Sequence, residues 1–115
     1  MKLPKRGDVF LARLDPREGS EQAGSRPVIV VTRDAINQSS PVVVVVPCTD
    51  APNKGRMYPS QVLIKSGEGG LTKDSVALGE QVRAISTTRL VKQLGALKPA
   101  TLALIETALK ITLDW

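Results

Sequence analysis

The sequence predicts a mainly β fold, a small β-barrel with one C-terminal helix, in a single domain that spans residues 1–115. Runs of alternating or β-branched residues fill the first three quarters of the chain, and both patterns are typical of strands. Clusters of turn-forming residues separate these runs, which indicates short, bent, antiparallel strands. The last segment changes to a spacing of three to four residues, the period of an amphipathic helix.

The first half of the chain contains the strongest strand signals. Residues 8–14 follow a period of two, which predicts a strand with one apolar face. Residues 28–32 and 42–46 are continuous β-branched runs, and their restricted χ1 rotation favours strands that are buried on both faces. Between these two runs, residues 33–41 have room for one helical turn. After Pro47 the mixture of turn formers predicts irregular structure.

The second half predicts shorter elements. Residues 58–65, 75–78 and 81–85 read as three further strands. The hydroxyl groups that begin at Ser86 can cap a short helical stretch that continues to Lys92, because hydroxyls accept hydrogen bonds from free backbone N–H groups.

The C-terminal segment predicts one amphipathic helix. Pro99 stands where a first helical residue would, since that position needs no N–H donor. Apolar residues then recur at helical spacing, at Leu102, Ile105, Leu109 and Leu113. We interpret this stripe as packed on the sheet, with a partner-binding helix as the alternative. Trp115, at the end of the sequence, could cap the core or lie in a contact with a partner.

Charge and composition limit the chemistry. Lys and Arg number 16 against 11 Asp and Glu, and the formal net charge of +5 suits a polyanionic partner, although a protein can be basic without one. The sequence has no His, which excludes Ser-His-Asp and Cys-His arrangements. Cys48 is the only cysteine, so an internal disulfide is excluded and a reducing compartment is favoured. The first residues lack the apolar region of a signal peptide, and no apolar run approaches the roughly 20 residues of a membrane span, so we expect a cytoplasmic protein.

Two residues stand out by position. Arg26 lies at the end of the long polar loop of residues 15–25, where a buried strand begins, and Thr49 lies just past the valine strand. If the two strands pair, a guanidinium and a hydroxyl meet at one rim of the barrel. The alternatives are an ion pair of Arg26 with Glu21 or Asp34, and a turn hydrogen bond for Thr49.

A series of motifs along nearly the whole chain resembles the MazF/PemK-type toxins. They include Arg-Pro-Val-Ile-Val and Val-Pro-Cys-Thr, and in chain order they occupy residues 5–10, 14–16, 19–22, 26–30, 46–49, 70–78, 80–85, 89–90 and 95–97. The resemblance implies an SH3-like barrel of the plasmid maintenance toxin and cell growth inhibitor type, which forms a homodimer. It also implies sequence-selective cleavage of single-stranded RNA, with no metal or cofactor, and an antitoxin whose acidic, partly disordered segment covers the RNA groove.

The same resemblance implies that Arg26 and Thr49 are the catalytic pair. RNA supplies its own nucleophile, the 2′-OH, so Arg26 would bind the non-bridging phosphate oxygens and Thr49 would donate a further hydrogen bond. A guanidinium is a poor base, so the proton acceptor stays open, and Glu21 is the carboxylate nearest to the motif in sequence.

Other residues are candidates for RNA binding, each with the alternative of an ordinary solvated side chain. Lys54 and Arg56 could contact phosphates, and Gln81 and Arg83 could contact base edges. Tyr58 is the main candidate for base stacking in a chain that has only three aromatic residues, one each of Trp, Tyr and Phe.

Two other functions fit the same fold. A non-enzymatic toxin that inhibits DNA gyrase would depend on exposed residues of the last helix, and an RNA-binding SH3-like module would bind RNA without cutting it. The pair of Arg26 and Thr49 and the Gly-Ser-Glu-Gln loop of residues 19–22 favour the ribonuclease.

Overall fold

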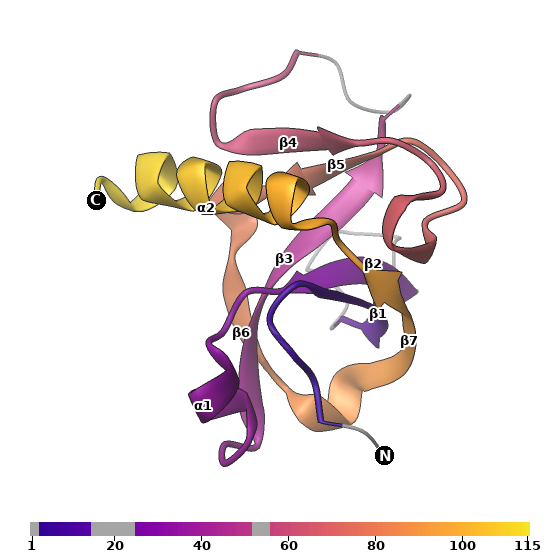
Figure 1. Cartoon of the computed structure of the whole chain (residues 1–115), viewed down its shortest axis with the longest axis vertical. Helices are drawn as coiled ribbons and strands as arrows, with labels where there is room; N and C mark the ends of the chain where they lie inside the picture. The colour runs from indigo at the N-terminus through magenta and orange to yellow at the C-terminus, as the bar shows by residue number, and fades with distance from the viewer. Residues whose placement is uncertain (1–2, 15–24, 52–55) are drawn as a thin grey trace, which may run out of the picture.

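The computed structural model describes residues 3–14, 25–51 and 56–115, and a bent antiparallel sheet with one long helix forms most of it (Figure 1). The strands are β1 (Asp8–Arg13), β2 (Ser25–Val30), β3 (Val42–Asp50), β4 (Gln61–Ile64), β5 (Ser75–Leu78), β6 (Arg83–Ser86) and β7 (Leu90–Ala96). The α-helices are α1 (Asp34–Asn37) and α2 (Pro99–Leu113), and the short 3₁₀ helices are η2 (Glu68–Gly70), η3 (Gly79–Gln81) and η4 (Thr87–Arg89).

The strand order is β4-β5-β3-β2-β1-β7, and β6 pairs with β3 as a branch off this path. The mainly β class and the C-terminal helix that the sequence predicts are confirmed. The barrel is not closed, because β4 and β7 lie at opposite ends of the path and no strand pairing joins them within the described residues. No helix among those residues is long and apolar enough to cross a membrane.

β3 is the strand on which the sheet is built. One of its edges pairs with β6 over Val42–Val45, then with β5 from Cys48 onward, while β2 pairs with its other edge. Pro47 stands between the β6 and β5 pairings, where its missing N–H costs no bond to either strand. The strand therefore continues to Asp50, and the prediction of irregular structure after Pro47 is wrong for residues 48–50.

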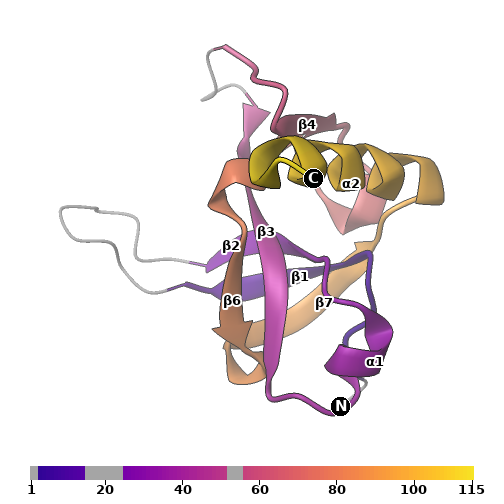
Figure 2. The same ribbon diagram turned by 90° about the vertical axis from the view of Figure 1, so that its left-hand side faces the viewer.

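The core forms on both faces of the central strands. On one face, Val9, Ile29 and Val46 pack with Ile105 and other residues of α2. On the other face lies a second cluster, formed by Phe10, Ala12, Val28, Val30, Val43, Val45, Ile85 and Leu90. The prediction that the valine strand is buried on both faces is confirmed for Val43, Val45 and Val46, whereas Val42 is 41% exposed and Val44 is half-buried. α2 lies across β4 and η3 at one end of the sheet (Figures 1 and 2).

β7 was not expected from the sequence. The stretch after Ser86 forms only the three residues of η4, with the Ser86 hydroxyl accepting from the Thr88 N–H at 3.2 Å as a cap. From Leu90 the chain is extended and pairs with β1, so the helical stretch predicted to reach Lys92 is wrong beyond Arg89. Pairing with a strand that lies far away in sequence overrides the weak local helix signal.

Candidate functional site

Strands β2 and β3 bring Arg26 and Thr49 together. Val28 lies opposite Pro47 in this pair, and the same register continued by two residues leads to Arg26 and Thr49. Side chains alternate between faces along a strand, so Arg26 shares a face with Val28, and Thr49 shares one with Pro47. Both residues line one open pocket of about 580 Å³, which we call the Arg26 pocket. The two residues that the sequence analysis places near each other thus line the same pocket.

Two of the alternatives considered for this pair fall on residues 3–14, 25–51 and 56–115, and neither is observed there; the ion pair of Arg26 with Glu21 lies outside the described residues. Arg26 forms no ion pair with another described residue, and Asp34 accepts instead from the backbone N–H of Arg6 at 2.8 Å. Thr49 lies inside the sheet, opposite Val76 of β5, and not in a turn.

The other lining residues of the Arg26 pocket come from two segments that lie side by side. The turn before β4 and the first residue of that strand supply Tyr58, Ser60 and Gln61, and the end of β5 with η3 supplies Leu78, Glu80 and Gln81. Gln61 lies opposite Leu78 in the β4–β5 pair, which fixes the two segments against each other.

Hydrogen bonds join these two segments at the pocket wall. The Ser60 hydroxyl donates to Oε1 of Glu80, and Nε2 of Gln61 donates to Oε2 of the same carboxylate, both at 2.9 Å. Oε1 of Gln61 accepts from the backbone N–H of Tyr58 at 3.2 Å. The wall of the pocket therefore has a carboxylate held by two donors.

Sequence reasoning missed four of these residues: Ser60, Gln61, Leu78 and Glu80. Gln61 and Glu80 meet only through the β4–β5 pairing, 19 residues apart in the chain. The available signals were that Glu80 directly precedes Gln81, a candidate for RNA binding, and that it begins the motif of residues 80–85.

The predicted RNA-binding residues divide into two groups. Tyr58 and Gln81 line the Arg26 pocket, and the guanidinium carbon of Arg56 lies 6.0 Å from the centroid of the Tyr58 ring, a cation–π distance. Arg83 lies on β6 opposite Val45 and is not part of the lining.

Two further predicted site residues, Glu21 and Lys54, lie outside the described residues. Their proposed roles as proton acceptor and phosphate contact stay predictions.

Cys48, next to Thr49, is not an accessible nucleophile. Its side chain is buried, and burial raises the pKa of the Cys48 thiol to about 12. The thiol therefore stays protonated at neutral pH, which leaves the hydroxyl, guanidinium, carboxylate and amide groups of the pocket for chemistry.

A second concave surface, of about 680 Å³, lies between α1, β3 and α2, and we call it the α2 groove. Its lining is mainly apolar, and it includes the exposed side chains of Ile36, Leu113 and Trp115. Trp115 is 85% exposed, so the alternative that it caps the core is wrong. Charged residues also line the groove: Arg6, Arg33, Glu106 and Lys110.

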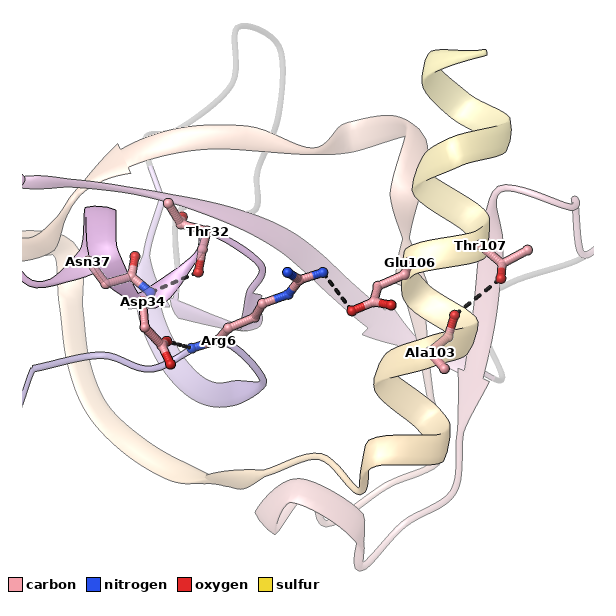
Figure 3. A network of polar contacts seen from close by, with 7 residues as sticks. All are labelled: Arg6, Thr32, Asp34, Asn37, Ala103, Glu106 and Thr107. Carbon is pink, nitrogen blue, oxygen red and sulfur yellow. Dashed lines mark hydrogen bonds and ion pairs between the residues drawn. The ribbon is translucent and has the colours of Figure 1, made fainter. Parts of the chain in front are cut away.

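A polar network ties the α2 groove together (Figure 3). Arg6 reaches Glu106 on α2 with an ion pair of 2.6 Å, and the backbone N–H of Arg6 donates to Asp34 on α1. The buried Asn37 donates through Nδ2 to the Thr32 carbonyl oxygen at 2.8 Å. The exposed ion pair stabilises little by itself, but together these contacts fix the N-terminal segment and α1 relative to α2.

Comparison with known proteins gives a consistent result. The family model of the PemK-like, MazF-like toxin of type II toxin–antitoxin systems matches residues 5–113. A protein of Staphylococcus epidermidis named Endoribonuclease MazF is 42% identical over 109 residues, which are 95% of this chain and 90% of that protein. Endoribonuclease MazF9 of Mycobacterium tuberculosis is 39% identical over 117 residues, 97% of this chain and 98% of that protein.

Solved structures have the same fold. The crystal structure of MazF from Deinococcus radiodurans superposes with a TM-score of 0.81 at 24% identity and covers 100% of both chains. An endoribonuclease in complex with its cognate antitoxin, from a mycobacterial species, superposes with a TM-score of 0.77 at 26% identity, covering 96% of this chain and 95% of that one.

Proposed function

The chain belongs to the PemK-like, MazF-like toxins of type II toxin–antitoxin systems, and from this premise we propose that it is a sequence-specific endoribonuclease that cuts single-stranded RNA. The observation that carries the proposal is that Arg26 and Thr49 line the same open pocket. We take residues 1–115 as one domain that acts in the cytoplasm.

The proposed reaction uses the 2′-OH of the RNA as the nucleophile. This oxygen attacks the adjacent phosphorus, the 5′-oxygen leaves, and a 2′,3′-cyclic phosphate remains on one fragment. The enzyme must align this attack and stabilise the charge that develops on the non-bridging oxygens. The Arg26 guanidinium suits that charge because it can donate two parallel hydrogen bonds, and the Thr49 hydroxyl can donate a third.

Glu80 offers a way to remove the proton from the 2′-OH. Of the carboxylates in the described residues, it is the one that lines the Arg26 pocket. Ser60 and Gln61 both donate to it, which holds this carboxylate at the wall of the pocket. Glu21 stays a second candidate from the sequence, whereas Glu80 lies in η3, directly after β5.

Base recognition would use the Tyr58 side of the pocket. The Tyr58 ring, 52% exposed, can stack on a base, with Arg56 above it, and Gln81 can hydrogen-bond to a base edge. We also propose that Lys54 contacts a phosphate and that Arg83 contacts a base edge. Only the sequence supports these two contacts.

The proposed partners follow from the family. A cognate antitoxin with an acidic, partly disordered segment would cover the basic RNA site, and a structural relative at 26% identity is described in complex with its cognate antitoxin. We also propose a homodimer, in which a second copy covers the apolar side chains of the α2 groove.

The test is to incubate the purified protein, in EDTA, with a long mixed-sequence single-stranded RNA and a DNA of matching sequence. We expect discrete RNA cuts, 2′,3′-cyclic phosphate ends and intact DNA, because DNA has no 2′-OH. Mapping the fragment ends gives the recognition sequence.

Intact RNA at protein excess would contradict the proposal. Two other functions of this fold would then remain. Inhibition of gyrase would be measured in a supercoiling assay, and RNA binding without cleavage would be measured by the RNA that the protein retains.

A further inference from the structure

The turn before β4 is fixed to the β5–η3 segment by both backbone and side chains. The Gly79 N–H donates to the Ser60 carbonyl oxygen at 2.9 Å, and the Gln61 N–H donates to the Tyr58 carbonyl oxygen at the same distance. The side chain of Gln61 adds two bonds, one to the Glu80 carboxylate and one from the Tyr58 N–H.

We propose that Gln61 is a positioning residue of the RNA pocket, whose carboxamide holds the Glu80 carboxylate and the Tyr58 backbone in a fixed relation to each other. This inference rests on the proposed ribonuclease function. Gln61 connects the carboxylate suited to accept the proton with the backbone of the residue whose ring is suited to stack on a base.

Burial and orientation support this role. Gln61 is only 9% exposed, whereas Glu80 is exposed and Tyr58 is 52% exposed. A buried amide that loses a partner pays a desolvation cost, so its bonds are kept rather than exchanged with water. Only one orientation of the amide satisfies both partners, because Oε1 must accept from Tyr58 while Nε2 donates to Glu80.

The position of Glu80 relative to Tyr58 matters because one RNA strand must engage both. A displacement of about 1 Å at a reacting group can lower the rate by about 10²-fold. Gln61 touches neither reacting oxygen in the proposed reaction, so its effect passes through the two residues that it holds.

Two substitutions separate the bonds of Gln61. Gln61→Met keeps a similar volume and loses both side-chain bonds. Gln61→Glu keeps an acceptor for the Tyr58 N–H, but places a second carboxylate against Glu80. We expect each substitution to lower kcat/KM about tenfold or more, because each removes a hydrogen bond to a charged group. Gln61→Glu should have the larger effect, because its carboxylate also repels that of Glu80.

The double variant Gln61→Glu/Glu80→Gln exchanges the two side chains. It should restore RNA binding, which a variant that is only less stable would not do. The amide of residue 80 can now donate to the carboxylate of residue 61, so the link is restored with the charge moved. We expect RNA with a 2′-deoxy group at the cleavage position to bind the exchanged protein within about threefold of wild type, while Gln61→Glu alone binds it about tenfold more weakly. Cleavage stays low in the exchange, since the carboxylate has moved.

Gln93→Met is the matched control. Gln93 lies on β7, donates to the Gly95 carbonyl oxygen and does not line the Arg26 pocket, so this variant should cut and bind like wild type. Circular dichroism and thermal melting establish that each variant is folded at the assay temperature. If Gln61→Glu does not fold, Gln61→Met and the double variant are compared with wild type instead.

These measurements distinguish a failure of the positioning role of Gln61 from a failure of the proposed ribonuclease function. If wild type cuts RNA and Gln61→Met cuts it equally well, or if the exchange binds RNA no better than Gln61→Glu, the positioning role of Gln61 is wrong and the ribonuclease stands. If wild type does not cut RNA, the proposed function itself fails.

Discussion

Arg26 is the residue on which the proposed chemistry depends most, and its removal is the most direct test at the residue scale. Arg26→Ala removes the donors to the phosphate oxygens where charge develops, so we expect cleavage to fall by about 10²-fold or more. RNA binding should persist in part, because Tyr58 and Gln81 also line the pocket. Single-turnover cleavage and the affinity for RNA with a 2′-deoxy group at the cleavage site measure the two effects separately.

Arg26→Lys serves as the companion variant. It keeps the charge but loses the planar fork, so we expect an activity between those of Arg26→Ala and wild type. Equal activity of Arg26→Ala and wild type would remove Arg26 from the mechanism.

Cys48 predicts a pH dependence of stability. Burial raises the folded pKa of the Cys48 thiol to about 12, above the 9.0 of an exposed thiol, so the unfolded chain loses this proton first as the pH rises. The stabilising effect is therefore complete below about pH 9 and is lost progressively between about pH 9 and 12. The difference in melting temperature between wild type and Cys48→Ala should shrink over that range. A difference independent of pH would contradict the burial of the thiol.

At the scale of elements, Gly79 is the point where η3 touches the turn before β4. A Cβ at this position would lie closer to the Ser60 carbonyl oxygen than Cβ atoms come in real structures. Gly79→Ala must therefore displace the turn that carries Tyr58, and we expect about a tenfold loss of kcat/KM for displacements of this kind. Kinetics well below the melting temperature measure the loss.

Gly95→Ala is a control of similar steric severity at a different place. Its Cβ would meet the backbone of Gly69 and Gly70, where β7 packs against η2. Overpacking there costs stability, of the order of 1–3 kcal/mol, but the contact does not involve the Arg26 pocket. If Gly95→Ala loses as much kcat/KM as Gly79→Ala, the effect of Gly79 is not specific to the pocket.

The elements also explain how much could be predicted from the sequence. Local signals are sufficient for the valine strand and for Pro99 at the start of α2, because each depends on neighbours in the chain. That Arg26 and Thr49 share a pocket depends also on the pairing of β2 with β3, which the sequence alone leaves open. β7 was missed because it is a strand only through its pairing with β1. Glu80 was missed as a pocket residue because Ser60 and Gln61, its partners, are brought to it by the β4–β5 register.

At the scale of the whole molecule, the Arg26 pocket and the α2 groove meet at one short segment. Gln81 lines the first and the next residue, Val82, lines the second. η3 also packs against α2, so a partner that covers the groove touches the segment that carries Glu80 and Gln81. A homodimer formed through the α2 groove would therefore restrain one wall of the RNA site in each copy.

This arrangement gives a prediction about assembly. Leu113 lines the α2 groove and is 43% exposed, so Leu113→Glu places a charge that would have to be buried in the proposed dimer. We expect light scattering to give a dimer mass for wild type and a monomer mass for Leu113→Glu. Leu104→Glu is the matched control, because Leu104 is 57% exposed on the same helix but outside the groove, and it should remain dimeric. A wild-type protein that is monomeric at tens of micromolar, or two variants with the same mass, would show that a second copy does not cover this groove.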